Sequence, residues 1–175
     1  MYPFTEEQFK IEGVKLNLGC GDVYLDGFVN VDLYAEKADE KLDIRKLDVY
    51  QDNSIALILA SHVIEHFHWD ETLNIIKEWY RVLLPGGWLV MEFPDATKCF
   101  KSFLEIAPTN LYLKGQLFPQ IIGNSSKPGH EHKTLLWMEH AGMLLKAAGF
   151  NDIWINENTP ISNIKQWVTR LDCRK

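Results

Sequence analysis

The stretch from residue 14 to residue 22 constrains the fold of this chain more than any other. Apolar residues alternate with polar ones at Val14, Leu16 and Leu18, which is typical of a strand, and the pattern stops at Gly19-Cys20-Gly21. Glycine is favoured where φ is unusual or where the backbone must touch a ligand directly. The stretch therefore predicts a buried strand that ends in a tight turn, with the backbone of the turn available to a ligand.

A second short apolar run, residues 28–31, ends at Asp32. An acidic side chain at the end of a neighbouring strand is placed to accept hydrogen bonds from both hydroxyls of a ribose. The glycine turn and this carboxylate together predict a site for a cofactor that contains a nucleoside.

The order and spacing of these residues resemble those of the class I S-adenosylmethionine-dependent methyltransferases, in particular the compact, methyltransferase type 11-like members. The resemblance runs in register from about Lys15 to Asp95, close to half of the chain. Beyond the glycine turn and Asp32, it is carried by Asp43-Ile44, Leu47, the turn at 52–54, the apolar run 55–60, Ser61-His-Val-Ile-Glu-His66 and Arg81-Val-Leu-Leu-Pro-Gly-Gly87.

The resemblance implies an α/β fold with a Rossmann-like doubly wound sheet, mostly parallel, that ends in an antiparallel C-terminal hairpin. The length fits a single methyltransferase domain over residues 1–175. The implied strand order is 3-2-1-4-5-7-6, with strands expected at 14–18, 28–31, 41–44, 55–60, 88–93, 152–156 and 165–171. Helices are expected after a capping box at Thr5, from an N-cap at Asp70 to about residue 83, and over 95–105, 110–122 and 134–149.

The first two connections between strands are too short for the usual helices. Only nine residues, 19–27, separate the first strand from the second, whereas a parallel crossover normally needs about a dozen. The segment 33–40 is equally tight. We therefore expect the first crossover helices to be reduced or absent. One face of the sheet would then be thinly covered, which makes it a candidate surface for a homodimer.

Composition excludes several classes of partner. The net charge is −6 and there is no run of Lys or Arg, so a long nucleic acid is an unfavourable partner. No apolar run approaches the roughly 18 residues needed to span a bilayer. The N-terminus lacks the basic and apolar regions of a secretory signal. Cysteines at 20, 99 and 173 form neither a disulfide framework nor a metal motif. These features predict a cytoplasmic protein that does not bind membranes.

The resemblance implies that S-adenosyl-L-methionine is the cofactor and S-adenosyl-L-homocysteine the product. In this assignment the glycine turn lies against the methionine and ribose, Asp32 binds the ribose hydroxyls, and Asp43 accepts from the adenine amino group. The residues implied in cofactor binding are Leu18, Gly19, Cys20, Gly21, Asp32, Leu33, Asp43, Ile44, Ser61 and His62. The alternative is a purely structural glycine turn, with Asp43 as the cap of a turn.

Methyl transfer from a sulfonium is an in-line displacement with an activated leaving group, so the protein mainly has to align and desolvate the reactants. The segment 96–133 is the expected acceptor lid. Candidates for a base that takes a proton from the acceptor are His66, His132 and Asp95. The alternatives are hydrogen-bonded loop histidines, and an N-cap role for Asp95.

Two histidine patterns have spacings that occur in zinc sites. His62 and His66 are four residues apart, and His130-Glu-His132 places two imidazoles on one side of an extended segment. A site also needs a third ligand, and no cysteine supplies one at a suitable spacing. The sequence therefore leads us to expect no metal.

The expected function is transfer of a methyl group to an oxygen or nitrogen of a small molecule, such as a metabolite or a sugar. Phe93-Pro94-Asp95 does not match the Asn-Pro-Pro-Tyr motif of nucleobase amino-methyltransferases. A nicotinamide-dependent oxidoreductase would need a third glycine at Tyr24 and an acidic residue about 20 positions further on, whereas Asp32 follows Gly21 after eleven. A non-catalytic S-adenosylmethionine-binding module or regulatory subunit stays open as an alternative. The aromatic candidates for the acceptor cleft are Tyr112, Phe118, Trp137 and Trp154.

Overall fold

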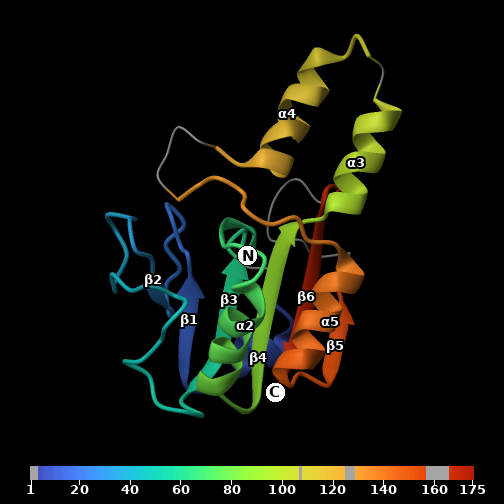
Figure 1. Ribbon diagram of the computed structural model, residues 1–175. Helices are drawn as coiled ribbons and strands as arrows, with labels where there is room; N and C mark the ends of the chain where they lie inside the picture. The colour runs from blue at the N-terminus through green and yellow to red at the C-terminus, as the bar shows by residue number, and fades with distance from the viewer. Residues whose placement is uncertain (1–3, 107, 125–128, 157–165) are drawn as a thin grey trace.

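The computed structural model describes residues 4–106, 108–124, 129–156 and 166–175, which form a sheet with helices on both faces (Figure 1). The sheet has six strands in the order β2-β1-β3-β4-β6-β5. They are β1 (Val14–Leu18), β2 (Val29–Val31), β3 (Ile55–Ser61), β4 (Leu83–Pro94), β5 (Asp152–Ile155) and β6 (Val168–Arg174). The first four strands are parallel, and β6 is antiparallel to both β4 and β5. The mostly parallel sheet with an antiparallel C-terminal hairpin is thereby confirmed.

The third strand expected at 41–44 does not form, and this part of the prediction is wrong. Only an isolated parallel bridge, between Val31 and Glu40, continues the sheet beyond β2. The backbone of this segment is used elsewhere, because the carbonyl of Ile44 accepts a hydrogen bond from Trp79 Nε1 at 3.0 Å. The Asp43 side chain also accepts from the backbone N–H of Arg45, which closes a turn. The rest of the predicted strand order holds.

The expectation that the first crossovers lack helices is confirmed, since residues 19–28 and 32–54 contain turns and no helix. In the first crossover, the side chain of Asn30 supplies hydrogen bonds to the loop backbone. Asn30, fully buried in β2, accepts from the Leu25 N–H and from Asn17 Nδ2, and it donates to the Leu25 carbonyl. Because buried backbone groups need partners, these bonds permit a loop at this position.

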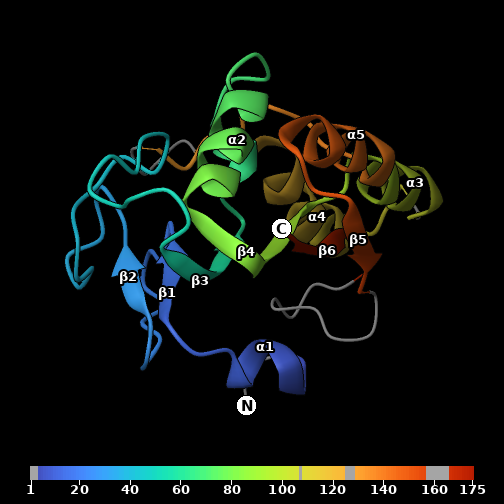
Figure 2. The ribbon, with the colours of Figure 1, turned by 90° about the horizontal axis from the view of Figure 1, so that it is seen from below.

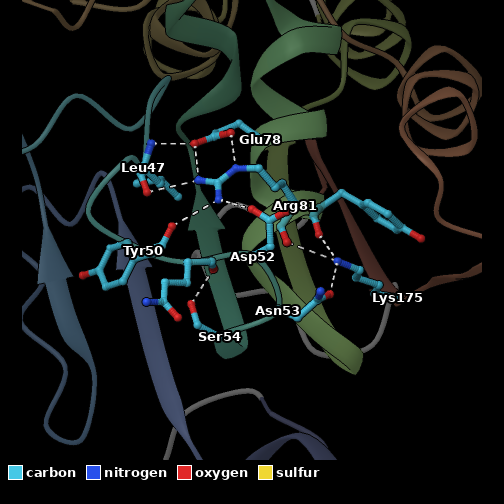
Figure 3. Close-up of polar contacts among 10 residues, drawn as sticks. Leu47, Tyr50, Asp52, Asn53, Ser54, Glu78, Arg81 and Lys175 are labelled. Carbon is cyan, nitrogen blue, oxygen red and sulfur yellow. Dashed lines mark hydrogen bonds and ion pairs between the residues drawn. The ribbon is translucent and has the colours of Figure 1, made fainter.

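The second helix-free segment is tied by Arg81 to the helix that precedes β4 (Figure 3). Its guanidinium donates to the carbonyls of Leu47 and Tyr50 and to Oδ1 of Asp52. It also makes a two-bond contact with the carboxylate of Glu78, at 2.8 Å for each bond. One residue of the helix that precedes β4 thus holds three positions of the loop.

The helices are α1 (Glu6–Lys10), the short 3-10 helix η1 (Ile64–His66), α2 (Thr72–Val82), α3 (Ala96–Glu105), α4 (Leu111–Ile122) and α5 (Met138–Ala148). Figure 2 shows α2 and α5 on one face of the sheet and α1 on the other. The capping box predicted at Thr5 is present. On the α1 side, Phe4, Ile11 and Phe28 pack over a cluster of Leu25, Leu57, Leu59, Trp88 and Val90. Self-association through this face stays a prediction.

Several element boundaries differ from the prediction. Strand β6, expected at 165–171, ends at Arg174, and residue 165 lies outside the described residues. Helix α2 begins at Thr72, with Glu71 and not Asp70 at its N-cap. Strand β4 begins at Leu83, not at residue 88, and its pairing with β3 shifts register across the Pro-Gly-Gly segment. There the Gly86 N–H donates to the Lys175 carbonyl, and the Gly87 carbonyl accepts from the Lys175 N–H. Helix α5 begins at Met138, four residues after the expected start at Thr134. The N–H groups of residues 133 and 134 both donate to the carbonyl of Glu65, which keeps this segment extended.

Helices α3 and α4 form a hairpin that rises above the carboxyl ends of the parallel strands (Figure 1). Their starts agree with the prediction to within one residue. Both pack around a small cluster of Cys99, Leu117 and Trp167. Residues 129–137 then cross over the strand ends on their way to α5 (Figure 1). Among the described residues, no helix has the length and apolar character needed to cross a membrane.

Candidate active site

The glycine turn after β1 combines a packing requirement with an open surface. Gly19 has φ +62°, and a Cβ atom there would lie 2.6 Å from Cγ2 of Val63, so the end of β1 can approach the end of β3 only without a side chain. Gly21 has φ +51°, but a Cβ atom there would meet no described atom within 4 Å. Between them, the buried Cys20 donates its N–H to the carbonyl of Val31. Gly19 is therefore needed for packing, while the backbone at Gly21 is open to a ligand.

Asp32 lies beside this turn, half-buried at the end of β2. Its Oδ2 accepts from the Gly21 N–H at 2.9 Å, and Oδ1 accepts from the N–H groups of Tyr34 and Ala35 at 2.7 and 2.8 Å. Partial burial opposes ionisation of Asp32, but these three N–H groups hold its pKa below the ordinary value. A carboxylate has about four acceptor positions, so the anion keeps capacity for a hydroxyl on Oδ2.

Of the two residues expected at the adenine, Asp43 is held in an ion pair and Ile44 is buried. The Asp43 carboxylate is bound by Arg45, whose Nε and Nη2 reach it at 2.7–3.0 Å, and this guanidinium lowers the pKa of Asp43. Ile44 is buried in the main core. Leu33, by contrast, is 46% exposed beside Asp32, where an apolar side chain can lie against a flat ring. At this edge the Asp43 carboxylate is already paired with Arg45, whereas the apolar side chain of Leu33 is exposed.

At the end of β3, the half-buried Ser61 is followed by an ionic cluster centred on His62. His62 has φ +55°, its Nδ1 lies 3.3 Å from Oε1 of Glu65, and its Nε2 lies 3.6 Å from Oε1 of Glu92. Both carboxylates are buried. Burial opposes the charged imidazole, but the two carboxylates outweigh it and raise the pKa of His62 to about 9. A cationic histidine is thus fixed at the strand ends.

The sequence prediction included His62 but missed both of its acidic partners. The sequence could have indicated Glu92 as a functional residue, since it is a charged residue inside the apolar run 88–93. No sequence pattern indicated Glu65, because its burial depends on how η1 is held against distant parts of the chain.

Residues 129–134, which we call the roof segment, cover this cluster. The His66 Nδ1 donates to the carbonyl of Glu131 at 3.1 Å, and the rings of His66 and His132 are 5.0 Å apart. At its other end, a Cβ atom on Gly129 would lie 3.1 Å from the Tyr34 ring. The roof segment therefore reaches from the end of β2 to the end of β3, and it brings together His66 and His132, which are 66 positions apart in the sequence.

Asp95, the third candidate base, is an N-cap, as the alternative interpretation held. Its Oδ1 accepts from the N–H groups of Thr97 and Lys98, which begin α3. Its Oδ2 accepts from Thr169 Oγ1 and the Met138 N–H. These four bonds use the capacity of the buried carboxylate, which leaves none for an acceptor proton.

The four aromatic candidates do not form one cleft. Tyr112 and Phe118 are exposed on α4, and Trp137 packs against His140. Trp154 packs against Trp88 on the α1 side of the sheet, where both rings line a hollow of about 740 Å³ between α1 and the strands. This hollow lies away from the glycine turn and Asp32, so we do not assign it to the cofactor.

Comparison with known proteins gives one family match and many structural matches. The model of a methyltransferase domain matches residues 28–91. No curated protein matches the chain. One structural match is a SAM-dependent methyltransferase from Methanosarcina mazei, with a TM-score of 0.67 and 15% identity, covering 100% of this chain and 98% of that one. Another, from Archaeoglobus fulgidus, has a TM-score of 0.65 and 16% identity, covering 97% and 89%.

A third structure, from Burkholderia thailandensis, is a 1,6-didemethyltoxoflavin-N1-methyltransferase with bound S-adenosylhomocysteine. Its TM-score is 0.61 at 14% identity, with 97% of this chain and 73% of that chain covered. This chain spans only 64% of a longer match from Bordetella parapertussis. At these identities the structures establish the fold. The family match covers β2, β3 and most of β4, and it begins after the glycine turn. The chain therefore has the fold of S-adenosylmethionine-dependent methyltransferases, and its residues 28–91 match the model of a methyltransferase domain.

Proposed function

We propose that this protein is an enzyme that transfers a methyl group from S-adenosyl-L-methionine to an oxygen or nitrogen of a small acceptor, such as a sugar or another metabolite. The observation that carries the proposal is the bond from the Gly21 N–H to Asp32 Oδ2, which joins the open glycine turn to an ionised carboxylate. The Burkholderia thailandensis methyltransferase, which shares the fold, has S-adenosylhomocysteine bound, and this supports the choice of cofactor.

In the proposed complex, the turn at residues 18–21 lies against the methionine and ribose through its backbone. A ribose hydroxyl donates to Asp32, and the exposed Leu33 lies against the adenine. Asp43 and Ile44 border the adenine. Asp43 accepts a hydrogen bond from the adenine amino group while its carboxylate stays paired to Arg45. Ser61 and the cationic His62 border the methionine tail, whose carboxylate complements the charge.

The acceptor enters from the side of the α3–α4 hairpin and the roof segment, which together correspond to the proposed lid over 96–133. Since the sulfonium is already activated, the main task of these elements is to align the acceptor and exclude water. His66 and His132, whose rings are 5.0 Å apart, are the proposed candidate bases on this side. We assign no proton transfer to Asp95, because its acceptor positions are filled.

Calorimetric titration with S-adenosylmethionine, S-adenosylhomocysteine and NAD tests the cofactor assignment. We expect the first two to bind and NAD not to bind. Asp32→Ala should lose about 1.5–3 kcal/mol of affinity, since it removes a charged hydrogen-bond acceptor. Asp48→Asn, at an exposed position on the neighbouring loop, serves as the control. Equal affinities of the wild type and Asp32→Ala would refute the placement of the ribose.

A non-catalytic binding module is the second candidate, and the helix-free crossovers at 19–28 and 32–54 are the observation that favours it. The two candidates differ in turnover and not in cofactor binding. Incubation with a panel of small hydroxyl and amino acceptors, read out as S-adenosylhomocysteine formed, separates them.

A further inference from the structure

The end of β3 and the roof segment together hold a group of side chains that suits a metal ion better than a proton relay. Glu65, His66 and His132 each offer one ligand atom, and these atoms lie within 4.8 Å of one another. Two imidazoles and one carboxylate are a common ligand set for zinc and other first-row divalent ions. We propose that Glu65, His66 and His132 bind a divalent transition-metal ion of the zinc class.

Glu65 provides the strongest argument. Its side chain is 2% exposed, and among the described residues neither of its carboxylate oxygens has a hydrogen-bond partner. Its nearest cationic neighbour, His62 Nδ1, forms an ion pair at 3.3 Å with one oxygen only. A buried carboxylate with unfilled acceptor positions is costly unless a cation compensates it. A metal ion next to Glu65 would fill those positions.

The two histidines are oriented as ligands usually are. His66 donates from Nδ1 to the carbonyl of Glu131, and in the neutral tautomer that this bond selects the lone pair is on Nε2. The His132 ring has the backbone of Gln120 as a hydrogen-bond partner, and its Nε2 lies 4.0 Å from Oε1 of Glu65. Metal-binding histidines almost always donate their second ring nitrogen to a carbonyl or carboxylate in this way, because that bond fixes the tautomer and the ring orientation.

The site explains why the sequence led to the opposite expectation. The zinc spacings of His62 with His66, and of His130 with His132, suggested pairs within each segment and lacked a third ligand. In the structure one histidine comes from each segment, and the third ligand is the residue next to His66 in the chain. The present proposal replaces the expectation of no metal.

Three protein ligands leave a position for water or for another oxygen or nitrogen, which is the arrangement of a catalytic and not a purely structural zinc site. The metal would also tie the roof segment to η1, since the ligands come from both. On the proposed function, the open position would hold the acceptor oxygen or nitrogen and orient it toward the methyl donor. In that role His66 and His132 act as ligands and not as bases.

Zinc binding by the tag-free protein, measured without S-adenosylmethionine, tests the site independently of methyl transfer. After dialysis against a chelator, the protein competes for ZnCl₂ with a chromophoric chelator. We expect one ion per chain for the wild type. Glu65→Gln and His132→Gln should each weaken binding by more than about 100-fold, since loss of an outer-shell partner alone costs about 10–100-fold. His68→Gln, at an exposed position near η1, is the matched control.

Equal zinc affinities for the wild type and Glu65→Gln would overturn the proposal, as would an equal loss in the His68→Gln control. Because a variant of a buried residue can fail to fold, X-ray absorption at the zinc edge of the wild type provides a second test. A first shell of nitrogen and oxygen with imidazole scattering supports the site, and a shell dominated by sulfur refutes it. Failure of both tests would leave the cofactor titration above unaffected, so the two proposals fail separately.

Discussion

Gly19 and Val63 approach so closely that a Cβ atom on Gly19 would lie 2.6 Å from Cγ2 of Val63. This contact sets the spacing between the ends of β1 and β3, between which the cofactor is proposed to bind. At Gly21, only two residues further on, the same added atom would meet no described neighbour within 4 Å. The two glycines therefore separate a packing effect from a purely conformational one.

We predict that Gly19→Ala destabilises the fold much more than Gly21→Ala. Both variants force a non-glycine residue into the left-handed region, at about 1–2 kcal/mol. Only Gly19→Ala adds the overpacking against Val63, about 1–3 kcal/mol more. Urea unfolding measures both. Adding Val63→Ala to Gly19→Ala should recover part of the overpacking loss, and a strictly additive double variant would show that this contact is not the cause.

Arg81→Lys should lower the free energy of unfolding by about 1.5–3 kcal/mol, since lysine cannot reproduce the two-bond contact with Glu78 and the bonds to the loop carbonyls. The effect should be local. Amide hydrogen exchange is expected to accelerate over residues 45–54, while the exchange of β3 follows only the global change. Lys10→Ala, which removes an exposed pair within α1, is the control and should change stability by less than about 0.5 kcal/mol. Uniform acceleration along the chain would argue against the role of Arg81 as a loop anchor.

The same pair predicts a pH dependence. The guanidinium of Arg81 lowers the pKa of Glu78 from its ordinary value of 4.5. A lowered carboxyl pKa contributes stability that is present above pH 4.5 and is lost as the pH falls through the folded-state value. The difference in unfolding free energy between the wild type and Glu78→Gln should therefore be largest near neutral pH and shrink below about pH 4. A difference that stays constant from pH 7 to pH 3 would contradict this account.

Sequence patterns predicted those features whose cause is local. The alternation at 14–18 and the glycines after it specify β1 and its turn, and Asp95 followed by a helical pattern specifies the start of α3. The missing third strand was not predictable in this way, because the carbonyl of Ile44 is taken by Trp79, 35 positions away. For the same reason no local pattern shows that His66 and His132 meet, since the roof segment first has to return from the α3–α4 hairpin.

Asp95→Asn should reduce stability and leave cofactor binding unchanged. The amide keeps one acceptor oxygen but presents an N–H₂ donor where the Asp95 carboxylate now accepts from two further donors. The expected loss is about 1–3 kcal/mol, as for a buried group left unsatisfied. Thermal unfolding and titration with S-adenosylhomocysteine measure the two effects. A variant with wild-type stability and no methyl transfer would show instead that Asp95 is a base.

The three thiols are all free and buried, and this predicts sensitivity to alkaline pH. Burial raises the pKa of Cys20 to about 11 and that of Cys99 to about 12, and it also raises the pKa of Cys173. The unfolded thiols ionise near pH 9.0, while the folded ones stay protonated, so ionisation favours the unfolded chain as the pH rises.

Stability should therefore be constant with respect to these groups below pH 9 and fall above it, by up to about 1.4 kcal/mol per thiol and pH unit. Urea unfolding of the wild type and of Cys99→Ala at pH 8 and pH 10 measures the effect. The variant starts from a lower stability because it leaves a small cavity, but it should lose less between the two pH values. An equal loss in both proteins would mean that groups other than this thiol cause the alkaline destabilisation, since removing the thiol removes its ionisation from the unfolded state.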